Sequence, residues 1–346
     1  MNRMIRVPTA GAVAAALWCS CATLSAQTPT APQATASSES QVGRQTQAGQ
    51  AMQRLAAVDD RLATPTGHEL NVSVGSYTYT EPGAQGISIH GAKLGGEYTG
   101  TMPLDRRRHW FVQANVRGIL GNVAYTGWCS PWLITANSAS PNGYELGVGD
   151  ASPCSETGDK DWYLEGRALV GKDLIGNAWA FSPYTGVGVR HLSNGTAGIP
   201  GYRTDNYLYL PLGATARTEV ASHRVLSVTL EYDRLVHGWQ TTRDSEFGGG
   251  SVPATTGTPA FTIDGFTDVS FAQHAGWALR ASTTYKVSTH WSVEPYYVRW
   301  RLGDSPASNE TVAFTVNNVT AQEQLGFYEP QNVTNEFGVK LGLHFK

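Results

Sequence analysis

The last stretch of the chain, residues 334–346, alternates between apolar and polar residues over nearly its whole length (TNEFGVKLGLHFK). One parity carries the apolar side chains Phe337, Val339, Leu341, Leu343 and Phe345, and the other carries Glu336, Lys340 and His344 between glycines. Successive side chains of a β-strand point to opposite faces, so the stretch predicts a strand with one apolar wall and one ionisable wall. A soluble β-sandwich would bury the apolar wall in a core. A transmembrane barrel would turn it toward lipid and keep the charges in its interior.

The N-terminus has the pattern of a secretory signal peptide. Arg3 and Arg6 precede an apolar run at 10–18, and small residues follow with a cleavage position after Ala26 or Ala22. We therefore assign residues 1–26 to a signal peptide and expect the protein to be exported. No later apolar run approaches the roughly 20 residues that a transmembrane helix needs, so any membrane span has to be built from strands.

Two cysteines remain once the signal peptide is removed. In an exported chain such a pair predicts a disulfide, here between Cys129 and Cys154, that closes one long loop. No cluster of cysteine and histidine has the spacing of a zinc site, so we expect neither a metal nor another cofactor. The net charge of −3 and the charged fraction of 15% do not point to a nucleic-acid partner.

The rest of the chain divides into two parts. Residues 27–67 are rich in Gln, Ala, Ser, Thr and Pro and predict a flexible linker. Residues 68–346 repeat one pattern of alternating strand, turn and alternating strand, about ten times in all. We predict an all-β fold: a transmembrane, antiparallel, up-and-down β-barrel of about ten strands, located in the outer membrane.

The connections between the predicted strands alternate in length. Short turns are expected at 105–109, 175–179, 220–224 and 288–290, and long polar loops at 126–159, 193–204, 239–273 and 303–332. Short periplasmic turns and long extracellular loops are typical of outer-membrane barrels. Five tryptophans are expected in an aromatic girdle near the short-turn ends: Trp110, Trp162, Trp179, Trp277 and Trp291.

Charged residues recur on the wall opposite the apolar one. The expected lumen-facing charges are Lys93, Glu97, Arg117, Glu165, Arg167, Arg190, Arg217, Glu231, Asp233, Arg280, Glu336 and Lys340. Ten strands enclose an interior only a little wider than the eight-stranded case that side chains fill. Because buried charges need partners, we expect a lumen plugged by salt bridges. A narrow porin-like channel is the alternative.

One short motif suggests chemistry. Residues 190–194 (RHLSN) resemble the His-x-Ser-Asn motif of lipid A 3-O-deacylases, outer-membrane barrels that cleave an acyl ester. The resemblance implies that Ser193 is the nucleophile and His191 its base. Both residues share the parity of Val187 and Val189, so they are expected to face lipid at the level of the outer leaflet. Asp205, the nearest acid, has the opposite orientation and is expected in the lumen.

A second motif, Asp159-Lys160-Asp161-Trp162, resembles the Asp-x-Asp-Trp of omptin proteases, which are ten-stranded barrels. The resemblance implies a protease in which two acids face an Asp/His pair that activates water. The chain has no Asp-x-His at the corresponding place, where it reads HGWQTTRDSEF at 237–247. Without a base, such a site cannot carry out general-base hydrolysis.

Longer phrases resemble a group of uncharacterised, omptin-like outer-membrane β-barrel proteins. They lie at 160–171, 201–214, 231–245, 291–300 and 328–345. The resemblance implies the barrel fold, outer-membrane lipid and lipopolysaccharide as surroundings, and barrel assembly machinery that reads the C-terminal strand. Such barrels normally end on an aromatic residue, whereas here Lys346 follows Phe345. The predicted role is a non-enzymatic one at the cell surface, in adhesion or another interaction, with deacylase, channel and protease as the alternatives.

Overall fold

The computed structural model describes residues 61–346 apart from 84–85, 106–108, 197–198 and 223. The predicted signal peptide at 1–26 and residues 27–60 of the predicted linker lie outside the described residues. In the described part no helix is long and apolar enough to cross a membrane.

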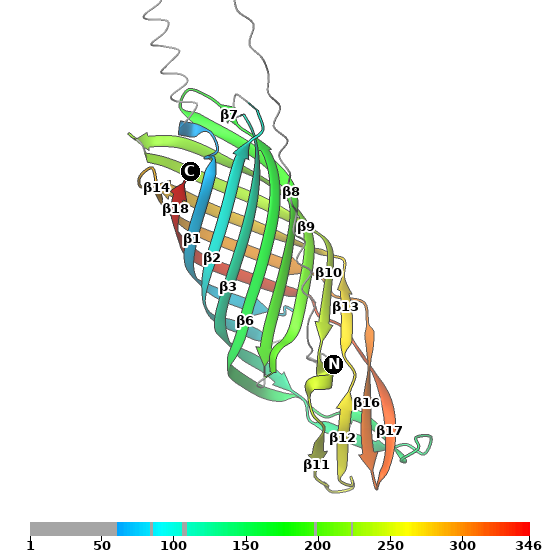
Figure 1. Ribbon diagram of the computed structural model, residues 1–346. Coiled ribbons are helices and arrows are strands. Elements are labelled where there is room, and N and C mark those ends of the chain that lie inside the picture. Colours follow the sequence, from blue (N-terminus) through cyan, green and yellow to red (C-terminus); the bar gives the residue numbers. More distant parts are fainter. Residues whose placement is uncertain (1–60, 84–85, 106–108, 197–198, 223) are drawn as a thin grey trace, which may run out of the picture.

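Ten long antiparallel strands form a closed barrel, which confirms the predicted fold (Figure 1). They are β1 (Gly67–Thr80), β2 (Ser88–Pro103), β3 (Trp110–Cys129), β6 (Ser152–Lys172), β8 (Trp179–Thr196), β9 (Ile199–Ala221), β10 (Arg224–Thr242), β14 (Gly276–Lys286), β15 (Trp291–Leu302) and β18 (Asn332–Phe345). Each pairs with the next in this order, and β1 pairs with β18 from His68↔Phe345 to Thr80↔Val333. The ring therefore has no open edge along this ladder.

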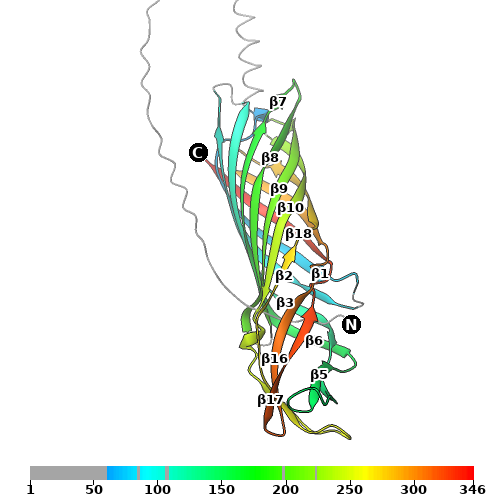
Figure 2. The ribbon, with the colours of Figure 1, turned by 90° about the vertical axis from the view of Figure 1, so that its right-hand side faces the viewer.

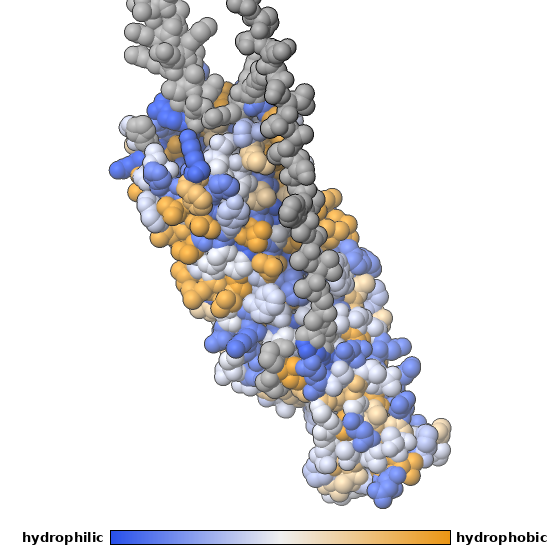
Figure 3. Space-filling model, viewed as in Figure 1, coloured by the Kyte–Doolittle hydropathy of each residue, from blue (hydrophilic) through white to orange (hydrophobic). Residues whose placement is uncertain are grey.

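The outer wall of the barrel is apolar. Leu70, Val72 and Val74 on β1 are 49%, 64% and 57% exposed, and the apolar residues of the neighbouring strands are exposed in the same way. Figure 3 shows apolar patches over the barrel and more polar surface toward its ends. Since a water-soluble protein rarely exposes so much apolar surface, this wall faces the lipid of the outer membrane.

Tryptophans lie at both edges of this apolar band. Trp110, Trp179 and Trp291 each begin a strand at the short-turn, periplasmic end, as predicted. The prediction is wrong for Trp162 and Trp277. Both lie toward the extracellular end, because β6 and β14 begin on that side and run toward the periplasm.

The periplasmic turns are short, and one of them contains the two-residue strand β7 (Leu174–Ile175). The extracellular connections contain β4 (Trp132–Ala136), β5 (Tyr144–Val148), the 3₁₀ turn η1 (Asp244–Glu246), β11 (Gly250–Val252), β12 (Phe261–Phe266), β13 (Val269–Gln273), β16 (Ser308–Val316) and β17 (Val319–Phe327). The prediction of a long loop at 193–204 is wrong, since β8 continues to Thr196 and β9 begins at Ile199. The ladder continues there because inward side chains find partners: Asn194 bonds Asp161, and Arg203 bonds Glu329.

Three extracellular connections assemble into a small folded unit, which we call the extracellular module (Figures 1 and 2). Strands β11, β12, β16 and β17 form a sheet, and the β4–β5 hairpin packs against it. Their shared apolar core consists of Ile134, Leu146, Phe261, Ile263, Val312, Phe314, Val316 and Ala321. A turn at Asn317 and Asn318, with φ of 50° and 64°, joins β16 to β17 in the conformation that tight hairpins need.

The predicted disulfide is present. Cys129 at the end of β3 and Cys154 near the start of β6 are joined with a Cα–Cα distance of 5.8 Å. The bond lies at the base of the segment that carries β4 and β5. It therefore fixes this hairpin to the barrel rim.

Candidate functional site

A buried layer of charges and aromatic rings crosses the middle of the lumen. Arg117 donates to Glu336 at 2.6 Å, and Glu336 also accepts hydrogen bonds from Tyr163 and Tyr296, each at 2.8 Å. The guanidinium of Arg190 lies 3.9 Å from the centre of the Tyr163 ring. All five side chains are at most 4% exposed. Each charge of this layer therefore has an opposite charge or an aromatic face beside it.

Arg280 extends this layer to the opposite wall. It forms ion pairs with Glu165 at 2.5 Å, Asp233 at 2.6 Å and Glu231 at 3.2 Å. Glu231 also pairs with Arg167, and Glu165 accepts a hydrogen bond from the Tyr209 hydroxyl at 2.8 Å. The charges of three strands, β6, β10 and β14, thus compensate one another across the barrel.

The remaining lumen-facing charges lie on either side of the layer. Lys93 pairs with Asp161, and Arg217 lies 3.6 Å from Asp173. Lys340 lies between Glu97 at 2.9 Å and Glu294 at 3.0 Å. Asp161 on β6 and Glu294 on β15 face the lumen. The sequence analysis did not predict them as the partners of Lys93 and Lys340.

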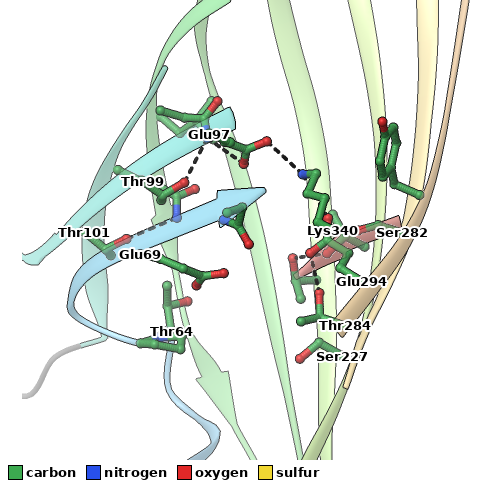
Figure 4. Close-up of a pocket in the computed structure, with 18 of the residues that line it drawn as sticks. Thr64, Glu69, Glu97, Thr99, Thr101, Ser227, Ser282, Thr284, Glu294 and Lys340 are labelled. Atoms are coloured by element: carbon green, nitrogen blue, oxygen red, sulfur yellow. Dashed lines mark hydrogen bonds and ion pairs between the residues drawn. The ribbon is translucent and has the colours of Figure 1, made fainter. Parts of the chain in front are cut away.

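A polar cavity of about 230 Å³ occupies the periplasmic half of the lumen (Figure 4). Its labelled lining residues are Thr64, Glu69, Glu97, Thr99, Thr101, Ser227, Ser282, Thr284, Glu294 and Lys340. Hydroxyls and ion-paired carboxylates dominate this lining, and Thr284 donates to Glu294 at 2.6 Å. Such a surface suits water or small polar solutes better than an apolar ligand.

Residues 61–64, just before β1, cover the periplasmic end of this cavity. Leu62 and Thr64 are 1% and 6% exposed. Asp173 accepts hydrogen bonds from the Thr64 backbone at 2.8 Å and from its hydroxyl at 2.7 Å, and Arg61 pairs with Glu219 at 3.0 Å. This part of the predicted flexible linker is therefore packed. We call residues 61–64 the periplasmic plug.

A second cavity, of about 480 Å³, lies between the extracellular mouth of the barrel and the extracellular module. Its aromatic lining includes Trp128, Trp132, Tyr202, Phe247 and Phe266, and its ionisable lining comprises Asp159, Arg203, Asp244 and Glu310. Apolar walls with a few polar groups are the usual composition of a ligand pocket. This cavity was not predicted from the sequence, because most of its lining comes from segments predicted to be irregular loops.

A carboxylate pair lies beside this cavity at the barrel mouth. The Tyr79 hydroxyl donates to Glu81 at 2.9 Å and lies 3.3 Å from Glu329. Arg203 and Gln240 each donate to Glu329 at 3.1 Å. Glu81 follows β1 in the extracellular turn, and burial raises its pKa to about 7, with the negative charge of Glu329 acting in the same direction.

His191 and Ser193 lie on the outward side of β8, as their parity predicted. The His191 ring lies 5.2 Å from the Trp162 ring, and its Nδ1 lies 2.7 Å from Oδ1 of Asn206. Residues two apart on a strand are separated by about 7 Å, and no hydrogen bond joins His191 to Ser193 in the described structure. Ser193 is 4% exposed. The two side chains are therefore neighbours without being coupled as nucleophile and base.

Asp161, from the motif that resembles omptin proteases, faces the lumen and is 1% exposed. Lys93 bonds its Oδ1 and Asn194 its Oδ2, so both oxygens are already engaged and no histidine contacts them. Within the described residues, no group of three or more His, Cys, Asp or Glu side chains is arranged to hold a metal ion.

Comparison with known proteins finds distant structural likeness only. No family model matches the chain, and no curated protein matches it. Among solved structures, the outer membrane protease OmpT from Escherichia coli is 12% identical with a TM-score of 0.42, over 82% of this chain and 98% of that one. An outer membrane channel from Pseudomonas putida F1 is 11% identical with a TM-score of 0.34, over 83% and 98%. The translocator domain of the autotransporter NalP from Neisseria meningitidis is 11% identical with a TM-score of 0.33, over 88% and 98%.

These structures include a protease, a channel and a translocator domain, so the likeness does not select an activity. The assignment as an integral outer-membrane barrel rests instead on the closed strand ladder and the apolar outer wall.

Proposed function

We propose that the protein is a non-conducting outer-membrane barrel that presents the extracellular module for an interaction at the cell surface. The observation that carries this proposal is the combination of a filled lumen with an ordered external unit. Arg117, Glu165 and Glu336, in the middle of the lumen, are at most 4% exposed. At the same time, Val312, Phe314 and Val316 form a fully buried core well outside the lipid band.

Transport is disfavoured by the same features. A solute entering from the periplasm would have to displace the plug at 61–64 and then separate Arg280 from its three carboxylate partners. Breaking one buried ion pair costs about 3–5 kcal/mol. A pore that conducts steadily would need a different arrangement of this layer.

Planar-bilayer recording tests the non-conducting part. The purified barrel is expected to give no steady single-channel steps, whereas Arg280→Ala combined with Arg117→Ala is expected to give them. Steady conductance of the wild-type protein would overturn this part.

Adherence of cells that display the protein tests the interaction part. Phe314→Asp places a charge in the core of the extracellular module and should abolish adherence while the barrel still assembles. Val319→Asp, at the exposed start of β17 where Val319 is 44% exposed, is the matched control and should adhere normally. Equal adherence of wild type, Phe314→Asp and cells without the protein would contradict the proposal.

A further inference from the structure

Two histidines face each other where the extracellular module joins the barrel. His237 lies on β10, and His274 follows the last residue of β13. β13 lies beside β10 (Figure 1), and their ladder reaches the barrel with the pair Gly238↔Gln273. The ladder between β10 and β14 continues the same register. His237 and His274, which come next on the two strands, are therefore directly opposite each other.

The two imidazole rings lie close together. Their centres are 5.3 Å apart, and their planes are inclined by 45°. Two imidazoles bound to one tetrahedral metal ion, with metal–nitrogen bonds of about 2.1 Å, have ring centres about 5 Å apart. The spacing of His237 and His274 therefore agrees with the spacing that a shared ion requires.

Both rings are accessible. His274 is exposed and His237 is partly exposed. Within the described part of the chain, no hydrogen bond or ion pair involves either imidazole. His237 also stacks on Trp239, with ring centres 5.5 Å apart, which restricts the orientation of the imidazole on the outer face of β10. The nitrogen lone pairs of the two histidines are thus available to an external ligand.

We propose that His237 and His274 together bind a divalent transition-metal ion such as Zn²⁺ or Cu²⁺ from the extracellular side. Neutral imidazole is the commonest metal ligand in proteins and suits these ions, whereas Mg²⁺ and Ca²⁺ prefer oxygen ligands. Cu²⁺ should bind more tightly than Zn²⁺. Water is expected to complete the coordination, because no third His, Cys, Asp or Glu of the described residues joins the pair. The sequence did not predict this site, since its two ligands come from strands that only the fold brings together.

A bound ion links two structural units. β10 is a barrel strand, whereas β13 leads back from β12 of the extracellular module. The ladder between them is short and spans Gly238↔Gln273 to Thr242↔Val269. An ion held at its barrel end stabilises the paired form of this ladder by mass action. The site lies apart from both cavities, since neither histidine lines them, and it does not depend on the proposed function.

The test measures Zn²⁺ binding to the untagged full-length protein in detergent by isothermal titration. Wild type is compared with His237→Gln, His274→Gln, the double variant and His90→Gln. His90 is an exposed histidine near the extracellular end of β2 and is the matched control. Loss of even an outer-shell partner costs about 10–100-fold in metal affinity, so each single variant should bind Zn²⁺ at least about tenfold more weakly, and His90→Gln should bind like wild type.

The double variant separates a shared ion from two independent imidazoles. If both histidines hold one ion, the double variant loses the same single Zn²⁺ as each single variant. Heat-dependent mobility on gels shows that each variant is folded. Zn²⁺ affinity equal to that of wild type in both single variants would overturn the proposal, and so would losses that add in the double variant.

Hydrogen exchange of the β13 amides at 269–273 gives a second readout. With free Zn²⁺ at about twice its Kd, exchange should slow about threefold in wild type and in His90→Gln. EDTA should reverse the effect, and Mg²⁺ should not produce it. Exchange in His237→Gln and His274→Gln should not respond to Zn²⁺. An equal response of these variants and wild type would contradict the assigned ligands.

Discussion

Arg117 on β3 and Glu336 on β18 are 219 residues apart in sequence and are joined by a 2.6 Å hydrogen-bonded ion pair in the centre of the barrel. Neither side chain is more than 4% exposed. This pair links the first third of the barrel to its last strand.

Glu336→Ala should destabilise the barrel by about 3–5 kcal/mol, because it leaves the buried charge of Arg117 without its main partner. Tyr163 and Tyr296 also lose their hydrogen-bond acceptor. Urea unfolding in lipid vesicles measures the change. Arg117→Met combined with Glu336→Leu should recover most of the loss, and a change below 1 kcal/mol in Glu336→Ala would contradict the assigned role of the pair.

The barrel mouth should depend on pH through Glu81. Its folded-state pKa of about 7 lies above the ordinary value of 4.5, so the folded state holds the proton more tightly than the unfolded chain. The stabilisation is complete below pH 4.5 and is lost as the pH rises through 7, which amounts to up to about 3 kcal/mol. Hydrogen exchange in the extracellular turn at 81–87 should accelerate over this range beyond the intrinsic effect of pH.

Glu81→Gln removes the ionisation and is the control for this dependence. At pH 8 the variant should protect the turn better than wild type, and at pH 4 the two should be alike. If the protection of the wild-type turn against hydrogen exchange does not change between pH 4 and 8, Glu81 does not titrate in this window.

Asp173→Ala should release the periplasmic plug, since Thr64 loses both of its hydrogen bonds to that carboxylate. A hydrogen bond to a charged group contributes about 1.5–3 kcal/mol, so exchange of the Thr64 amide should rise at least tenfold. Ser288→Ala, in the periplasmic turn between β14 and β15, removes the hydrogen bonds that its hydroxyl accepts from the His290 and Trp291 amides and should leave the plug unchanged. Equal plug exchange in wild type and Asp173→Ala would exclude Asp173 as the anchor.

Replacing both cysteines by serine should loosen the extracellular module and leave the barrel intact. The disulfide closes a loop of sequence separation 25, for which the loss is about 3 kcal/mol. Protease cleavage within 130–150 should become faster, while heat-dependent mobility of the barrel should not change. Cleavage at the wild-type rate would mean that packing of Ile134 and Leu146 alone holds the hairpin.

Ser193→Ala should leave the lipid A of expressing cells unchanged. His191 is held by Asn206 and is not hydrogen-bonded to Ser193, so it does not activate the hydroxyl in this structure. Mass spectra of lipid A from cells with wild type, Ser193→Ala and an empty vector are expected to be identical. Loss of an acyl chain with wild type alone would establish a deacylase and overturn the non-enzymatic role.

The alternation of apolar and polar residues predicted the barrel because one face of each strand contacts lipid and the other faces the polar lumen. It located the outward residues Leu341 and Val187 and also the inward residues Arg190 and Glu165. The same argument could have found Asp161, which follows the parity of its strand. It could not have placed Glu294, because both parities of the stretch at 291–301 carry apolar and aromatic residues. The number of strands was predicted from the turns, because glycine, proline and polar residues show where one strand ends and the next begins.

The extracellular module could not be predicted in this way. Its core joins Leu146 to Phe261 and Phe314, which come from three separate connections, and no periodicity of one segment specifies packing against another. The plug was missed because the composition of residues 27–67, rich in Gln, Ala, Ser, Thr and Pro, predicts a flexible linker up to the first strand. The extent of β8 and β9 was underestimated because Ser, Asn and Gly near 193–204 favour a turn, whereas pairing with Asp161 and Glu329 extends the ladder.

The position of β18 has a consequence for the order of assembly. This strand is made last, yet it forms one side of the seam with β1 and contributes Glu336 and Lys340 to the network in the lumen. Contacts between the two ends of a chain are slow to form because the whole intervening chain has to be brought together first. Until then Arg117 lacks the counter-charge of Glu336, and the carboxylate beside its guanidinium is that of Glu97 at 3.7 Å. Closure of the seam and neutralisation of Arg117 by Glu336 are thus one event, whereas ion pairs such as Arg280–Glu165 do not depend on β18.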